Sequence, residues 1–249
     1  MFNKAVGVYF SPTENTKKYV LEILKNINTE TEKFDLTTVK DAPEIVVDSN
    51  NLLVIGAPVY GGRIPKVAKE RFANIKGNNT PCIIVASYGN RHYDDALVEM
   101  KDMMTAQGFC VIGAAAVIGR HTYGEIQTDR PNEDDFKEIK SFVESILNKN
   151  ELVPIEVPGN RPYKDGGNGG KFKPQTSDAC VKCGLCAKTC PMGAIGEDFK
   201  TINDNCISCF SCIRKCPLKA KNADYEAYNS FALEFTQRLS QRRENEFFI

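Results

Sequence analysis

Short apolar runs alternate with longer amphipathic stretches in the first part of the chain. The runs at residues 5–10, 52–58, 82–86 and 111–118 are rich in Val, Ile and Ala and lead into polar or glycine-containing segments. Runs of this length between turn residues are typical of strands buried on both faces of a sheet. This part of the chain therefore predicts a parallel sheet whose strands are joined by helices.

Helical periodicity lies between the predicted strands. The first helix face, at the i, i+3, i+4 and i+7 spacing, comprises Val20, Ile23, Leu24 and Ile27. A second helix is expected over residues 94–107, and residues 34–36 are predicted to form an edge strand. The apolar face of the last helix of this domain comprises Phe136, Ile139, Val143 and Ile146.

The regular pattern stops near residue 150. Residues 150–174 accumulate proline and glycine, as expected of a linker between domains. Over residues 222–249 apolar side chains return at helical spacing, which predicts a C-terminal helix. Its apolar face comprises Tyr225, Tyr228, Ala232, Phe235 and Leu239. Because apolar faces are generally buried, we expect this face to pack on the chain's own domains rather than on a partner.

Eight of the ten cysteines fall between residues 180 and 216, in two copies of one run. Each copy reads C-x2-C-x2-C-x3-C followed by proline, the spacing of bacterial-type [4Fe-4S] ligation. Zinc usually takes two separated pairs of ligands and disulfides need an oxidising compartment, so both explain the pattern less well. Residues 178–221 thus resemble a bacterial two-cluster ferredoxin, and we place this domain at residues 175–221.

The resemblance implies which cysteines hold each cluster. The proline after the three-residue spacer turns the chain away, so the fourth cysteine of each run binds the other cluster. One set is Cys180, Cys183, Cys186 and Cys216, and the other is Cys190, Cys206, Cys209 and Cys212. The chain departs from the ferredoxin pattern in one place, because Lys221 follows the second run where Ile195 follows the first. We expect the cluster beside Lys221 to be the more exposed one.

Polar loops follow three of the predicted strands. Residues 11–16 carry Ser, Thr and Asn where a strand leads into a helix, a place that suits phosphate binding and helix capping equally. The loop lacks the glycines and lysine of nucleotide-binding loops. Residues 59–63 and 87–95 hold Tyr beside Gly at the ends of neighbouring strands. Ligands bind at such carboxyl ends in open parallel sheets, so the three loops are predicted to form one site. The long connection at residues 119–132 is expected to help cover it through Arg120, His121, Tyr123 and Arg130.

Over residues 1–147 these loops resemble those of flavodoxins. The resemblance implies an α/β fold with a doubly wound, five-stranded parallel sheet in the order 2-1-3-4-5, within a domain of residues 1–149. It also implies FMN as cofactor, with its phosphate held by Ser11, Thr13, Asn15 and Thr16 and its ring stacked by Tyr60 and Tyr93. The other residues predicted to bind FMN are Pro58, Gly61, Tyr88, Gly89 and Asn90. The alternative for either stacking Tyr is a surface aromatic whose hydroxyl meets water.

Composition narrows the possible functions. Lys plus Arg and Asp plus Glu each number 32, the formal net charge is zero, and no long basic run is present. Nucleic-acid binding is therefore not indicated. No segment reaches the length of a membrane span and no signal peptide is evident, so a cytoplasmic protein is expected. Oxygen-sensitive clusters fit a reducing cell interior, such as that of an anaerobe.

The two resemblances together match a family of flavodoxin–ferredoxin fusion proteins found mainly in anaerobic bacteria. This implies an electron-transfer protein that connects two [4Fe-4S] clusters, FMN and a redox partner protein. A second possibility is a flavin-dependent reductase of a small organic acceptor, and a third is a cofactor-free flavodoxin fold that serves as a docking platform. His92 and His121 are interpreted as surface residues rather than catalysts. The identity of the partner and the oligomeric state stay open.

Overall fold

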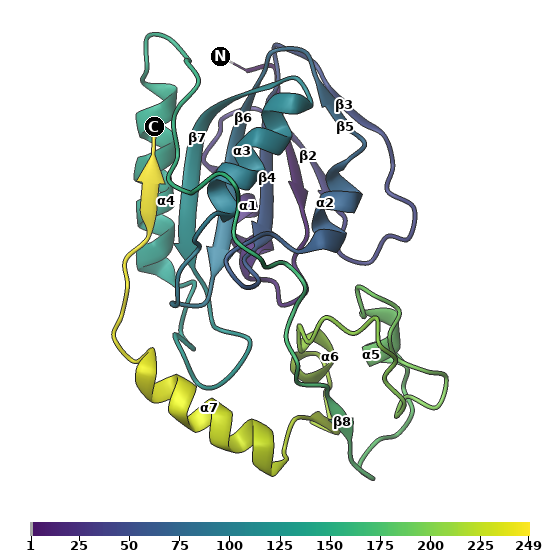
Figure 1. The fold of residues 1–249 in the computed structure, drawn as a ribbon. Helices are drawn as coiled ribbons and strands as arrows, with labels where there is room; N and C mark the ends of the chain where they lie inside the picture. The colour runs from purple at the N-terminus through teal and green to yellow at the C-terminus, as the bar shows by residue number, and fades with distance from the viewer. Residues whose placement is uncertain (1) are drawn as a thin grey trace.

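The computed structural model describes residues 2–249, and a six-stranded sheet forms its centre (Figure 1). The strand order is β10-β7-β6-β4-β1-β2. The strands are β1 (Lys4–Tyr9), β2 (Glu30–Asp35), β4 (Leu52–Pro58), β6 (Thr80–Tyr88), β7 (Phe109–Ile118) and β10 (Glu246–Phe248). The first five pair in parallel, which confirms the predicted flavodoxin-like order 2-1-3-4-5.

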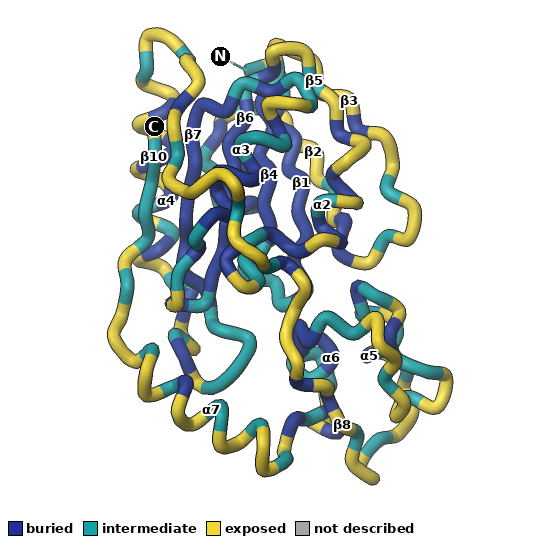
Figure 2. The backbone as a smooth tube through the Cα atoms, viewed as in Figure 1, coloured by how far each residue is buried: buried dark blue, intermediate teal, exposed yellow. Residues whose placement is uncertain are grey.

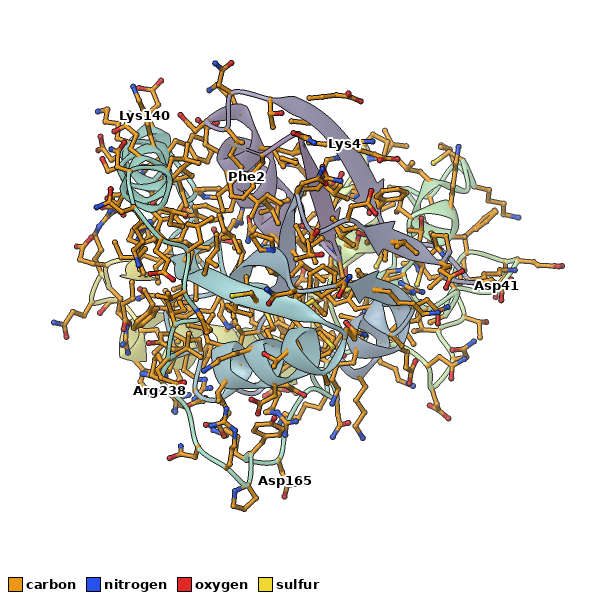
Figure 3. The ribbon with its side chains drawn as sticks, turned by 90° about the horizontal axis from the view of Figure 1, so that it is seen from above. Phe2, Lys4, Asp41, Lys140, Asp165 and Arg238 are labelled. Carbon is orange, nitrogen blue, oxygen red and sulfur yellow. The ribbon has the colours of Figure 1, made fainter. Side chains whose placement is uncertain are left out.

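Helices cover both faces of the sheet, as in other doubly wound folds. They are α1 (Asn15–Lys25) and α4 (Glu133–Leu147) on one face, and α2 (Lys66–Phe72) and α3 (Ala96–Ala106) on the other. Figure 2 shows the central strands as the most buried part of the chain. Viewed from above, Lys140 on α4 and Asp41, which follows β2, lie on opposite sides of this layered domain (Figure 3). In the described part of the chain, no helix has the length and apolarity that crossing a membrane requires.

A glycine in β4 lets the start of α1 approach the sheet closely. A Cβ atom at Gly56 would lie 2.7 Å from Cγ2 of Thr16 and of Val20. This is well inside the contact distance of carbon atoms, so a side chain here would push α1 away. The close approach places the Thr16 hydroxyl 2.6 Å from that of Ser87 in β6. It thereby fixes the loop between β1 and α1 to β6, across the intervening strand β4.

Three short elements were not predicted. A two-stranded parallel sheet joins β3 (Ile45–Val47) to β5 (Ile75–Gly77), and α2 has only seven residues. Elements this short span too few positions for the periodicity of their side chains to be recognised.

The predicted linker, residues 150–174, contains no helix or strand, and the structure describes all of it. It is nevertheless hydrogen-bonded to the sheet domain. The Asp95 carboxylate accepts from the backbone N–H groups of Asn160 and Lys164, each at 2.8 Å, and Ile155 N donates to a carbonyl of β7 at 2.9 Å. These contacts fix the linker along the domain, so it also positions the cysteine domain that follows.

The cysteine domain consists of two similar halves. Its elements are β8 (Gln175–Thr176), α5 (Leu185–Lys188), α6 (Ser211–Arg214) and β9 (Lys221–Asn222). The two strands pair in antiparallel fashion and join the ends of the domain. In Figure 1 the domain lies below the lower edge of the large sheet, with α6 between α5 and the C-terminal helix.

The C-terminal segment differs from the single helix predicted over residues 222–249. The helix α7 spans Glu226–Arg238, and the chain ends in β10, which pairs antiparallel with β7. Between them the tail is held by Asn90, whose Nδ2 donates to the carbonyls of Leu239 and Gln241 and whose Oδ1 accepts from Arg243 N. The helical spacing indicated α7 correctly. It could not show that the last residues pair with a strand far away in the sequence.

Replacing Asn90 with Gly should loosen this tail. Asn90 has a φ of 66°, which glycine adopts without strain, so the variant reports the lost hydrogen bonds. Leaving these backbone groups without partners should cost about 1–3 kcal/mol. We expect a thermal midpoint lower by about 2–10 °C, measured by circular dichroism. Asn79→Gly is the matched control, because Asn79 has a φ of 53° and an exposed side chain. An equal midpoint for both variants would contradict the anchoring role.

Candidate functional site

A cavity of about 280 Å³ lies at the carboxyl ends of β1, β4 and β6. Its walls include the three loops that follow these strands and the connection that follows β7. The opposite side is formed by Gly169, Gly170, Ile207, Ser208, Phe231 and Phe235. The cavity thus lies where the sheet domain, the linker, the cysteine domain and α7 meet.

Most of the residues predicted to bind FMN line this cavity. They are Ser11, Thr13, Asn15, Thr16, Pro58, Tyr60, Gly61, Tyr88 and Gly89. Arg120, His121 and Tyr123, from the long connection, line it too, as predicted. Arg130 does not, because it forms a buried ion pair with Asp135. Burial raises the pKa of the Asp135 carboxyl, but the charge and hydrogen bonds of Arg130, together with hydrogen bonds from Asn132 and Asn245, hold the pKa below its ordinary value.

The loop at residues 11–16 is shaped by its own polar side chains. Ser11 Oγ accepts from Lys17 N at 3.0 Å, Thr16 Oγ1 contacts Ser87 Oγ, and Asn15 Nδ2 donates to Arg120 O at 2.9 Å. The Ser11 bond satisfies one of the free N–H groups in the first turn of α1, which is a capping role. Thr13 is half-buried in the cavity wall. Thr13 and the remaining N–H groups at the start of α1 are therefore the best candidates for holding a phosphate.

Two residues of the cavity wall have a buried side-chain atom without a hydrogen-bond partner within the described residues. They are Tyr88, at its hydroxyl, and Arg120, at Nε. Burial raises the pKa of Tyr88 to about 12, and its hydroxyl lies beside Arg243 and Glu246 of the C-terminal tail. Buried polar groups are almost always paired, so a polar ligand in the cavity would supply the missing partner of Arg120 Nε. The sequence indicated both residues by their place in loops.

Asn90 and Tyr93, which were also predicted to bind FMN, are not among the residues that line the cavity. Asn90 holds the C-terminal tail instead. Tyr93 is buried, donates to Glu246 Oε2 at 2.8 Å and stacks on His92 with ring centroids 4.8 Å apart. The tail covers this side of the loop, and no feature of the sequence indicates that it reaches there.

His121 belongs to the cavity wall and is half-buried, which corrects its interpretation as a surface residue. Its ring centroid lies 4.9 Å from that of Phe235 in α7. Burial lowers the pKa of His121 to about 4, so the ring is neutral at pH 7. A neutral ring can accept a hydrogen bond, and Nδ1 lies 2.8 Å from Tyr123 N.

The clustered cysteines line two separate hollows in the cysteine domain. The outer site is lined by Cys180, Cys183, Cys186 and Cys216. The inner site is lined by Cys190, Cys206, Cys209 and Cys212. These are the two sets that the ferredoxin resemblance implied. No three His, Cys, Asp or Glu side chains among residues 2–249 are arranged to hold a single metal ion. A four-iron cluster does not need such an arrangement, because each of its cysteines binds a different iron atom.

The chemistry of both hollows fits a [4Fe-4S] group. Each offers four thiols, apolar walls and one buried polar atom without a partner in the described chain, namely Ser211 Oγ in the inner site and Lys221 Nζ in the outer site. Burial raises the pKa of Cys209 and Cys212 to about 12. Thiolates at these positions therefore need the positive charge of a metal to form at neutral pH.

The two sites differ in exposure. Around the outer site Cys183 is exposed, and Val181 and Leu218 are 67% and 50% exposed. Cys209 and Cys212 of the inner site are buried. The site beside Lys221 is thus the more exposed one, as expected, although Lys221 itself is buried.

The inner site adjoins the cavity. Ile207, which lies between two of the inner cysteines in the sequence, lines both hollows, and its neighbour Ser208 lines the cavity. Tyr123 Oη donates to Ser208 O at 3.1 Å. One short segment of backbone therefore separates the inner cysteines from the cavity at the edge of the sheet.

Replacing His121 with Gln should change how stability depends on pH. The folded pKa of about 4 lies below the ordinary value of 6.5. The neutral ring therefore stabilises the folded state fully above pH 6.5, and this contribution is lost as the pH falls toward 4. The gap in thermal midpoint between wild type and His121→Gln should shrink over this range. His92→Gln controls for the loss of a histidine. A gap that stays constant from pH 7 to pH 4 would contradict the burial effect.

Comparisons with known proteins bear on both parts of the chain. Residues 174–217 match the 4Fe-4S dicluster domain family. A stretch of 21 residues, 8% of this chain, is 76% identical to a ferredoxin of Megasphaera elsdenii and covers 39% of that protein. An uncharacterized protein of Methanocaldococcus jannaschii is 28% identical over 141 residues, which are 54% of this chain and 91% of that protein.

Flavodoxins are among the similar solved structures. A flavodoxin from the domain Archaea is 17% identical with a TM-score of 0.39, and the match covers 57% of this chain and 95% of that one. Oxidised flavodoxin 2 from Bacillus cereus is 14% identical with a TM-score of 0.42, and the match covers 58% and 97%. These likenesses concern the fold alone, which the strand order already shows. The chain thus joins a flavodoxin-like α/β domain to a 4Fe-4S dicluster ferredoxin domain.

Proposed function

We propose that this chain is an electron-transfer iron–sulfur flavoprotein that passes electrons between two [4Fe-4S] clusters and FMN. The observation that carries this proposal is the wall shared by the inner site and the cavity. Ile207 lines both, and Ser208 beside it is hydrogen-bonded to Tyr123 of the sheet domain. Cofactors in the two hollows would be held close together by one chain, which gives them a high effective concentration for each other.

The cavity wall has the groups that FMN needs. Thr13 and the N–H groups at the start of α1 would hold the phosphate, and the Arg120 guanidinium adds positive charge nearby. Tyr60 offers an aromatic surface for the ring. When bound, FMN supplies exchange of one or two electrons, which no side chain of the cavity provides.

The order of the outer site, the inner site and the cavity indicates a path for electrons. The outer site is exposed at Cys183 and ringed by the exposed side chains of Val181 and Leu218, so it is the place where a redox partner protein would dock. The inner site lies between it and the cavity. Electrons would pass between the partner and the cavity through the outer and inner sites in turn.

The size of the cavity, and the side chains that cover it, favour an electron carrier over a reductase. A volume of about 280 Å³ is at the small end for ligand pockets, and Phe231 and Phe235 of α7 lie across one side. Little room is left for an organic acceptor beside FMN. The unpaired Arg120 Nε argues against a cofactor-free platform, because nothing else among the described residues pairs with it.

The variant Thr13→Val tests the phosphate site. It removes a hydroxyl with little change of shape, and a hydrogen bond to a charged group is worth about 1.5–3 kcal/mol. The affinity for FMN should fall by about tenfold or more, whereas that for riboflavin, which has no phosphate, should hardly change. Fluorescence titration of the apoprotein measures both, with the exposed Thr128→Val as control. An equal loss for the two flavins would show that Thr13 does not hold the phosphate.

The variant Cys190→Ala tests the proposed path of electrons through the inner site. Because Cys190 lines the inner site, the variant should lose about half of the iron and give an EPR spectrum like that of Cys209→Ala, not that of Cys183→Ala. FMN should still bind. Its reduction by a reduced bacterial ferredoxin, too large to enter the cavity, should slow at least tenfold in stopped-flow measurements.

The control for this experiment is Cys110→Ala, since Cys110 lies in β7 away from both sites. A spectrum matching Cys183→Ala would show that the cysteines do not cross between the sites. An undiminished rate of flavin reduction after loss of the inner cluster would contradict the proposed path.

A further inference from the structure

Lys221 is a buried cation in the wall of the outer site. The side chain lies in β9, opposite Thr176 of β8, and only 2% of its surface is exposed. Its ammonium nitrogen has no hydrogen-bond partner within residues 2–249. It lines the same hollow as Cys180, Cys183 and Cys216.

A buried ammonium without a partner is strongly unfavourable, so the fold must offer it a negative charge. The four thiols of the outer site line the same hollow, and Lys221 also lies within electrostatic range of Asp198 and of Cys212 at the inner site. A [4Fe-4S] cluster with four thiolate ligands is anionic and gains one further negative charge on reduction. The bound cluster would therefore be the missing partner of Lys221.

The inner site provides an internal comparison. Ile195 stands five residues after Cys190, as Lys221 stands five residues after Cys216, and each follows an alanine. Ile195 lines the inner site and pairs in an isolated bridge with Ile202. Equivalent positions in the two halves of the domain thus hold a neutral side chain at one site and a cation at the other.

We propose that Lys221 raises the reduction potential of the outer cluster above that of the inner cluster. This inference rests on the proposed binding of two clusters and adds a direction to their electron transfer. A nearby positive charge stabilises the more negative, reduced state, and a buried charge is poorly screened by solvent. Electrons then rest preferentially on the outer cluster, where Cys183 is exposed to a partner.

The test replaces Lys221 with Met, which keeps an unbranched side chain and removes the charge. EPR-monitored redox titration of the anaerobically purified full chain gives the potential of each cluster. At a fixed potential near the midpoint, the reduced-to-oxidised ratio of the outer cluster should fall at least tenfold, which corresponds to about 59 mV for one electron. The inner cluster, whose Cys212 lies within range of Lys221, should shift clearly less than the outer one. The shift should persist in high salt, because the charge is buried.

Two further variants distinguish the effect of the Lys221 charge from the effect of its side-chain packing. Lys221→Arg keeps the positive charge and should keep the potential of the outer cluster close to that of the wild type. Lys188→Met removes an exposed lysine at the end of α5, two residues after Cys186, and should leave both potentials nearly unchanged in high salt. If Lys221→Met fails to assemble the outer cluster, Ile195→Lys provides the reciprocal measurement and must raise the potential of the inner cluster.

Full iron content with an unchanged outer potential in Lys221→Met would overturn the inference while leaving the proposed function intact. Equal shifts of both clusters, or no rise of the inner potential in Ile195→Lys, would overturn it too. A wild-type chain that assembles no clusters under anaerobic conditions would overturn the proposed function and this inference together.

Discussion

Packing around Tyr123 holds the parts of the molecule in their relative positions. Its ring contacts an aromatic cluster that comprises Phe172, Phe210, Tyr228 and Phe231, with centroids 5.1 to 6.2 Å from its own. These residues come from the linker, the cysteine domain and α7, while Tyr123 belongs to the sheet domain. Aromatic pairs of this kind contribute about 0.5–1.5 kcal/mol each beyond the area they bury, and they are insensitive to salt. Arg214 of α6 adds a hydrogen bond to His121 O at 2.5 Å. The spacing between the cavity and the inner site depends on this junction.

Unpaired polar atoms mark the places where ligands would complete the structure. Among the described residues, the buried side-chain atoms without partners are those of Tyr88, Gln107, Arg120, Ser211 and Lys221. Arg120, Ser211 and Lys221 line the cavity, the inner site and the outer site, respectively, whereas the Tyr88 hydroxyl lies beside Arg243 of the tail. Such atoms are rare in folded proteins because each is costly. Their concentration in three hollows is therefore a physical reason to regard these hollows as binding sites. We have no physical account of Gln107.

The C-terminal tail extends the sheet and positions the helix that covers one side of the cavity. By adding β10 to the edge of β7 it covers backbone groups that would otherwise be free to pair with another chain. The same tail anchors α7, which places Phe231 and Phe235 in the cavity wall. One wall of the cavity is thus positioned by a helix that leads into the three-residue strand β10.

Beyond the sheet order, which the resemblance to flavodoxins implied, the sequence by itself determined where the central strands lie and how the eight cysteines are spaced. These features are local, because buried strands need continuous apolar runs and cluster ligands need fixed spacing along one segment. Most of the cavity residues were also predictable, since loops at the carboxyl ends of parallel strands must converge. Only the tertiary structure decided that Asn90 and Tyr93 bind the tail, because their partners lie about 150 positions away. It likewise decided that His121 is neutral and that Lys221 is a buried cation, since burial depends on which distant segments pack over a side chain and not on its own neighbours in the sequence.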